Sequence, residues 1–290
     1  MLKIQPIDES AANDSVKDCY RQLKKTFRLP HLPLFFTYLG SFPEYLQYLT
    51  KQIVSTVDNT VFSGLIQEKG LTIEKQLRTH LHPSDDFTRW LQRNQYSPSF
   101  YNFQNDLKHI FETNLKLAFI FLALREAVKG WAVATKKLST TANATHREVE
   151  QRLNENSFVY NTIQYVIPNS FRDPRILDSR FRRNDNGKML KRVQHDSIEK
   201  DLLPEYLQLS RNEFAQALKT QEFLETRVVI EKDILNSLDL LPNFIVSPLN
   251  VVLQYTAKYS NFPELLYLLS EHFPTHAVQR MLFSGFMLQK

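Results

Sequence analysis

The sequence has little of several features that would place it in particular classes of protein. Cysteine occurs once in 290 residues, at Cys19, so no internal disulfide can form and we expect a partly buried apolar side chain there. The longest apolar run, residues 117–124, is far shorter than the roughly 20 residues that cross a bilayer. The N-terminal residues lack the apolar core of a secretory signal. We therefore predict a cytoplasmic protein without a membrane partner.

Basic and acidic side chains nearly balance along the chain, except in one segment. The chain carries 36 Lys and Arg against 31 Asp and Glu, a formal net charge of +5. Eight of the basic and four of the acidic side chains fall within residues 166–196, which leaves the rest of the chain close to neutral. Because nucleic acids bind basic side chains that are gathered on one folded face, we predict no nucleic-acid partner.

The same segment, residues 166–196, has no apolar periodicity and separates two stretches with clear helical patterning. Its phrases SRFRRND and MLKRVQHD resemble the translation of palindromic repeat elements that are scattered through bacterial genomes. We therefore predict a bacterial protein in which this disordered segment is a late insertion in a surface linker, where added length costs little stability. A basic arm that binds RNA or lipid is the alternative.

Helical periodicity is what the sequence does contain. Residues 16–27, with Ser15 as the cap, and residues 44–57, with a proline in the first turn, are predicted helices. The strongest pattern spans residues 106–131, where apolar side chains recur every three or four positions and share one face. Strand-like alternation is scarce, and only residues 244–253 are ambiguous. The sequence therefore predicts an all-α fold.

Two segments of the chain resemble each other. The string FPEYLQYL that begins at Phe42 recurs as FPELLYLL from Phe262, and each copy follows a helix that ends in Leu-Pro. We interpret the two strings as copies of one helical unit, and a third string, LPEYLQ from Leu203, as a chance match. On this alignment the second copy is truncated, because few residues remain after Pro263 to form a counterpart of residues 106–131.

This alignment divides the chain into four predicted parts. They are a first helical repeat (residues 1–140), a linker helix (141–165), the inserted segment (166–196) and a second, truncated helical repeat (197–290).

Further residues link the chain to a known family. Pro6-Ile7-Asp8-Glu9, the stretch from Phe36 to Pro43 and the stretch from Thr113 to Leu117 resemble parts of the DehI-type (group I) 2-haloacid dehalogenases. The likeness is good over residues 6–130 and beyond them rests mainly on residues 230–269. It implies an all-α pseudo-dimer of two related helical repeats, which acts on 2-haloalkanoic acids without cofactor or metal.

In that family, water displaces halide from the α-carbon and inverts it. An Asp of the second repeat activates the water and an Asn of the first repeat helps to hold it. An anionic base in a mostly apolar pocket has a raised pKa and a dry reaction volume. The resemblance makes Asn114 the catalytic Asn, and Phe35, Phe36 and Tyr255 are expected to line the pocket of a small carboxylate.

Asn114 is informative without the resemblance, because it lies on the apolar stripe of residues 106–131. A buried amide without partners would cost about 1–3 kcal/mol there. Two interpretations stay open. An amide that lines a pocket between the repeats would be half-buried and take partners from residues 246–259. An amide that only packs helices would bond to carbonyls of the first half.

The family's Asp does not carry over on this alignment. It lies eight residues before the second copy's proline, and counting back from Pro263 gives Tyr255. Tyrosine, with an ordinary pKa of about 10, is a poor base at neutral pH. We therefore predict a diverged, catalytically impaired 2-haloacid dehalogenase-like protein that binds a small carboxylate. An active hydrolytic dehalogenase and a helical protein-interaction module are the alternatives.

The histidines do not form a recognisable metal site. His80 and His82 have no third ligand nearby in the sequence, and Pro274, between His272 and His276, is expected to break the helix that would align them. We predict no metal and no cofactor, and the sequence leaves the oligomeric state open.

Overall fold

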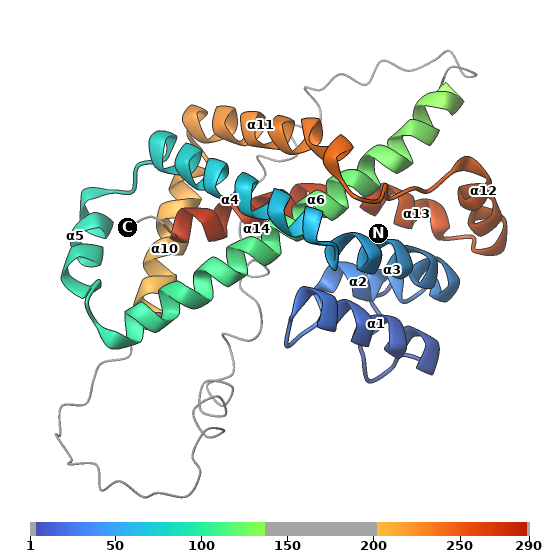
Figure 1. Ribbon diagram of the computed structural model, residues 1–290, viewed down its shortest axis with the longest axis horizontal. Helices are drawn as coiled ribbons and strands as arrows, with labels where there is room; N and C mark the ends of the chain where they lie inside the picture. Colours follow the sequence, from blue (N-terminus) through green and yellow to red (C-terminus); the bar gives the residue numbers. More distant parts are fainter. Residues whose placement is uncertain (1–3, 137–201, 289–290) are drawn as a thin grey trace, which may run out of the picture.

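The computed structural model describes residues 4–136 and 202–288, and in this part every regular element is a helix (Figure 1). The predicted all-α class is confirmed. The predicted linker helix (141–165) and insertion (166–196) lie outside the described residues. The helices of the first part are α1 (Asp14–Phe27), α2 (Leu34–Leu39), α3 (Pro43–Val57), α4 (Thr60–His80), α5 (Asp85–Asn94) and α6 (Pro98–Lys136). Those of the second part are α10 (Leu203–Ala217), α11 (Gln221–Asn236), the 3₁₀ turn η2 (Leu238–Leu240), α12 (Leu249–Lys258), α13 (Phe262–Tyr267), the π turn η3 (Leu268–His272) and α14 (Phe273–Met287).

Polar side chains fix where several helices begin. Asn13, Asn59, Ser84 and Thr220 each accept a hydrogen bond from a backbone N–H in the first turn of α1, α4, α5 and α11. Ser15, the expected cap of the first helix, lies inside α1, because Asn13 caps that helix earlier.

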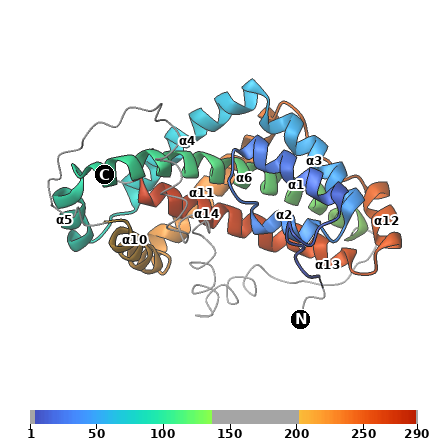
Figure 2. The ribbon, with the colours of Figure 1, turned by 90° about the horizontal axis from the view of Figure 1, so that it is seen from below.

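The long helix α6 and the last helix α14 form the centre of the molecule (Figures 1 and 2). The predicted helix over residues 106–131 lies within α6, which runs for 39 residues. Most side chains of α14 are buried on every side of the helix. A helix that is apolar all round belongs in a protein interior, so α14 is a core element on which α4 and α6 pack.

The helices on either side of this centre form two matching series. α3 and α10 are both 15 residues long, and each has a proline in its first turn. α4 and α11 follow, with the caps Asn59 and Thr220, and then come α5 and α12, both of 10 residues. The spacing between the prolines and between the caps is the same, 161 residues. The matching strings are therefore FPEYLQ at Phe42 and LPEYLQ at Leu203.

The two series exchange contacts across the molecule. Tyr45 of α3 packs edge-on against Tyr255 of α12, with ring centroids 5.2 Å apart. Its counterpart Tyr206 of α10 stacks on Trp90 of α5 at 5.6 Å. Figure 1 shows the pair α3 and α12 at one end of the molecule and the pair α10 and α5 at the other. Each series thus completes its core with a helix of the other.

Polar contacts repeat the same exchange. Gln52 of α3 accepts the backbone N–H of Val246, ahead of α12, at 2.8 Å. Glu213, which lies 161 residues after Gln52, accepts the backbone N–H of Ser84, ahead of α5, at 2.8 Å. Gln52 and Glu213, which are 161 residues apart, therefore make equivalent hydrogen bonds in the two series.

These contacts correct the alignment made from the sequence. The string at Phe262 begins α13, which leads into α14, and this path matches the start of α6 rather than α3. The counterpart of residues 106–131 that was expected to be missing is α14. It is shorter than α6, at 15 residues against 39. The string at Leu203, taken as a chance match, is the second copy.

In the described part, no helix combines the length and hydrophobicity that a bilayer span requires.

Candidate functional site

Asn114 lies where α6 packs against α14. Its side chain is buried, and its Nδ2 donates to the Oγ of Ser284 at 3.1 Å and to the backbone oxygen of Arg280 at 3.4 Å. Neither interpretation made from the sequence is fully correct. The amide is buried rather than half-buried, and its partners belong to the C-terminal half but lie outside residues 246–259.

Ser284 fixes the orientation of this amide. Its Oγ lies 2.9 Å from the backbone oxygens of both Arg280 and Met281, so its hydroxyl donates within its own helix and accepts from Asn114. In the described part of the chain, the Oδ1 of Asn114 has no protein donor, and it is not among the fully covered atoms. The amide oxygen is therefore free to accept a hydrogen bond from a ligand or water.

Arg280 lies one helical turn before Ser284 on α14. Its guanidinium lies over the ring of Phe35, 5.7 Å from the centroid, and its Nε is buried without a hydrogen-bond partner. Burial lowers the pKa of Arg280 to about 10, so the side chain stays charged at neutral pH. Among the described residues no carboxylate pairs with it, whereas Arg125 on α6 contacts both Glu126 and Glu231.

Other basic groups gather around Arg280. Arg227 reaches in from α11, and burial lowers its pKa. Burial first, and then the nearby charges of His272, Arg280 and Arg227, lower the pKa of His276 to about 4. His276 is therefore neutral at pH 7. The region carries positive charge in a desolvated setting, and such a setting favours a bound anion.

The sequence-predicted site residues divide into two groups. Phe35 packs on Phe121 with ring centroids 4.8 Å apart and lies under the guanidinium of Arg280, the residue whose backbone oxygen accepts from Asn114. Phe36 is fully buried between α1 and α6 and is a core residue. Tyr255 packs against Tyr45 on α3, and no contact joins it to Asn114 in the described residues.

Arg280 and Ser284 were missed in the sequence, although a signal was present. Arg280 is the one charged residue in the mostly apolar run from Ala277 to Leu288, and Ser284 follows it at the i+4 spacing that puts two side chains on one helix face. A lone arginine on a helix usually reads as a solvent-exposed residue. Only the packing of α14 shows that this one faces inward.

The histidine pair and the cysteine have other roles. His272 and His276 are aligned, with rings 6.4 Å apart and nearly parallel, because a π turn carries the helix past Pro274. The expected break there is wrong. Over the residues described, no group of three potential metal ligands forms. Cys19 is buried in α1, and burial raises the pKa of its thiol, so it acts as a small apolar packing group.

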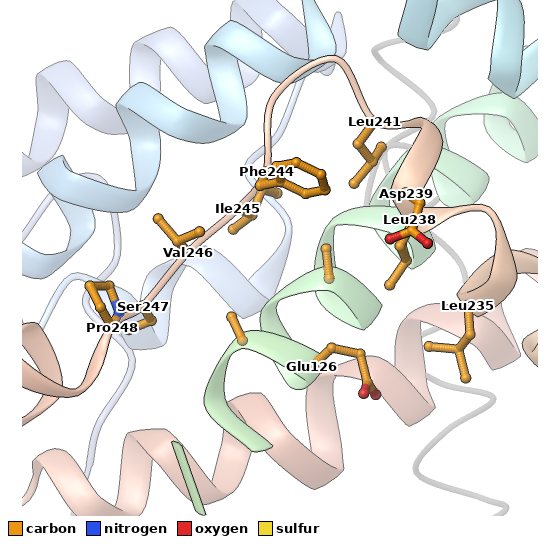
Figure 3. A pocket seen from close by; sticks show the side chains of 12 residues that line it. Glu126, Leu235, Leu238, Asp239, Leu241, Phe244, Ile245, Val246, Ser247 and Pro248 are labelled. Atoms are coloured by element: carbon orange, nitrogen blue, oxygen red, sulfur yellow. The ribbon is translucent and has the colours of Figure 1, made fainter. Parts of the chain in front are cut away.

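A hollow lies further along α6. It has a volume of about 500 Å³ and is bordered by α6 and the segment that follows α11 (Figure 3). Its lining is mostly apolar, with the carboxylates of Glu126 and Asp239 at its edge. Neither Asn114 nor Arg280 lines it, so it is separate from the region described above.

Comparison with known proteins identifies the fold. No protein-family model matches the sequence, and no curated protein matches it. Among solved structures, D-2-haloacid dehalogenase in complex with L-LA superposes with a TM-score of 0.63 at 15% identity, covering 99% of this chain and 97% of that one. A mutant of D-2-haloacid dehalogenase with D-2-CPA gives a TM-score of 0.62 at 16% identity, covering 99% and 96%. The chain therefore has a 2-haloacid dehalogenase-like fold over its whole length.

Proposed function

We propose that this chain is a diverged 2-haloacid dehalogenase-like protein that binds a small carboxylate beside Asn114 and is impaired in catalysis. The observation that carries the proposal is the setting of Asn114. Its amide is held by α14 through Ser284, its oxygen is left free, and the same helix carries Arg280, whose Nε is buried without a partner and with which no described carboxylate pairs.

The impairment rests on the chemistry that surrounds this amide. Hydrolytic displacement of halide needs a general base within hydrogen-bond reach of the attacking water. Residues 4–136 and 202–288 contribute no carboxylate that contacts Asn114, so they do not supply this base. The hydroxyl of Ser284 is committed to helix carbonyls, and His276, with a pKa lowered to about 4, is a weak base.

A second candidate, an active hydrolytic dehalogenase, is favoured by the corrected repeat. The resemblance puts the family's Asp eight residues before the second copy's proline. With the second copy at Leu203, that proline is Pro204, and the position before it is Asp196. Asp196 lies outside the described residues. The Tyr-Arg that follows the Asp in the family is absent, since Ser197 and Ile198 occupy those positions.

Halide release separates the two candidates. The protein is incubated with each enantiomer of 2-chloropropionate and with chloroacetate, alongside an active dehalogenase. We expect turnover below about 0.1 per second, under the range of ordinary enzymes. Faster turnover that Asp196→Asn abolishes would establish the second candidate. Binding of propionate, followed by ligand-observed NMR, tests the carboxylate site independently of turnover.

A further inference from the structure

We propose that Arg280 is the carboxylate-binding group of this protein and that its guanidinium, held over Phe35, takes both oxygens of a small aliphatic carboxylate. This inference rests on the proposed function, because it assigns a residue to the carboxylate site. It adds a residue of α14 that neither the sequence motifs nor the resemblance pointed to.

The first step of the argument is the missing counter-charge. Burying a guanidinium is costly unless a carboxylate or other hydrogen-bond acceptors compensate. Arg125, on the neighbouring helix, is compensated by Glu231, whereas Arg280 has no carboxylate partner in the described part and its Nε is unpartnered. A bound anion would supply the compensation that the described residues do not give to Arg280.

The second step is the way the guanidinium is held. The face of Phe35 supports it at 5.7 Å by a cation–π contact. A guanidinium that is supported on one face by an aromatic ring can still donate through its terminal N–H groups. Those groups present two parallel donors that match the two oxygens of a carboxylate, a geometry that a lysine cannot offer.

The third step is the charge of the surroundings. Arg227 adds a second guanidinium to the region, and the nearby charge of Glu231 acts on it without forming an ion pair among the described residues. Glu231 is hydrogen-bonded to Arg125, which offsets part of its charge. His276 is neutral at pH 7. An anion therefore meets attraction from Arg280 and Arg227 with little opposing charge.

The fourth step concerns the neighbouring amide. The backbone oxygen of Arg280 accepts from Asn114, so the base of the arginine side chain lies beside this amide. The free Oδ1 of Asn114 is therefore a second polar group near the arginine that a small carboxylic acid with a hydrogen-bond donor could contact.

The test measures binding and stability of the full-length protein together. Propionate and its neutral analogue propionamide are titrated by ligand-observed NMR into the wild type, Arg280→Met, Arg280→Lys and the control Arg78→Met. Arg78 is on the surface of α4, paired with Glu74. We expect Arg280→Met to weaken propionate binding about tenfold or more, the scale of a lost charged hydrogen bond, and to remove the preference over propionamide. Arg280→Lys should bind with intermediate affinity, and Arg78→Met like the wild type.

Thermal unfolding distinguishes a binding role from a packing role. Because methionine fills a similar space without an uncompensated charge, Arg280→Met should raise the melting temperature by about 2–4 °C. A lower melting temperature with unchanged propionate binding would overturn the assignment of Arg280 and leave the proposed function standing. Absence of propionate binding by the wild type would overturn both.

Discussion

At the scale of single residues, the polar side chains between α6 and α14 differ in whether they have hydrogen-bond partners. The Nδ2 of Asn114 donates to Ser284 between α6 and α14, whereas Arg280 on the same helix is left without a counter-charge in the described residues. Buried polar groups that serve packing are normally satisfied, and groups that serve function often are not. On the proposed function, this contrast makes Asn114 an orienting residue and Arg280 the residue that binds the carboxylate.

Replacing Asn114 by leucine tests this division. Ser284 and the carbonyl of Arg280 keep their own helix hydrogen bonds in Asn114→Leu, so no group is orphaned. We expect the free energy of unfolding, measured in urea, to fall by less than about 1 kcal/mol, below the usual cost of an unsatisfied buried group. Propionate binding should weaken in the same variant. A loss of stability above about 1.5 kcal/mol with binding intact would make Asn114 a packing residue.

Two buried tyrosines occupy equivalent positions in the two repeats. The hydroxyl of Tyr45 pairs with Ser247, and the hydroxyl of Tyr206 donates to the backbone oxygen of Met287. Burial raises the pKa of both phenols, so both stay protonated. The two rings occupy equivalent positions in the two series, where each packs against an aromatic ring of the other series, whereas their hydroxyls have different partners.

Removing either hydroxyl should lower the free energy of unfolding by a similar amount. We expect Tyr45→Phe and Tyr206→Phe each to lower the free energy of unfolding by about 1 kcal/mol, since each leaves a buried partner unsatisfied. The losses should add in the double variant, because the two sites share no partner. Tyr96→Phe, at a position that is 87% exposed, is the control and should not change the urea midpoint. A Tyr206→Phe protein as stable as this control would show that its hydroxyl bond contributes nothing.

At the scale of helices, the π turn before α14 explains a feature that the sequence obscured. Pro274 has no backbone N–H, and the N–H of Phe273 bonds to the oxygen of Leu268 instead of closing an ordinary α turn. The helix continues through this wider turn rather than ending. As a result, α14 stays in line with α13 and presents Arg280 and Ser284 to α6.

Two glycines inside helices give a matched pair for testing how closely α14 packs. A methyl group at Gly285 would meet Leu77 Cδ1 at 2.5 Å and Phe111 Cε2 at 3.0 Å, whereas one at Gly64 would meet nothing within 4 Å. Alanine is the better helix former by about 1 kcal/mol. We therefore expect Gly64→Ala to stabilise the protein by about 0.5–1 kcal/mol and Gly285→Ala to destabilise it by about 1–3 kcal/mol through overpacking. Urea unfolding measures both, and equal effects would mean that α14 has room to shift.

At the scale of the whole molecule, the fold class was predictable and the repeat alignment was not. Apolar side chains at three- and four-residue spacings identified the helix within α6 because that pattern extends over many turns. The aromatic-proline string was misleading at Phe262, because proline is favoured in the first turn of many helices and marks a helix start rather than a particular helix. The true second copy at Leu203 became recognisable only through its contacts with α5.

The candidate site was predictable in part for the same kind of reason. Asn114 stood out as a polar residue on an apolar stripe, and Phe35 followed from the resemblance. Arg280 did not stand out, because a sequence does not show which face of α14 meets α6. The assignment of Tyr255 depended on the alignment with Phe262 and loses its basis with it.

The exchange of helices between the repeats leads to a prediction about the two halves as separate chains. In the intact protein, α3 completes its core with α12, α10 completes its core with α5, and Lys69 of α4 pairs with Asp233 of α11 at 2.8 Å. Residues 1–140 and 197–290 expressed alone should each lack a cooperative thermal transition, because each exposes a core face. Co-expressed, they should co-purify in equal amounts by size exclusion and melt cooperatively.

A matched pair of variants shows whether the exchanged aromatic contacts drive this assembly. Tyr206→Ala in the second fragment should prevent co-purification, because it empties the gap between α10 and α5 that Trp90 borders. Tyr96→Ala in the first fragment removes a tyrosine that is 87% exposed and should leave the complex intact. A monomeric first fragment that melts cooperatively by itself would show that the first repeat is an independent domain, and that the exchange follows folding rather than causing it.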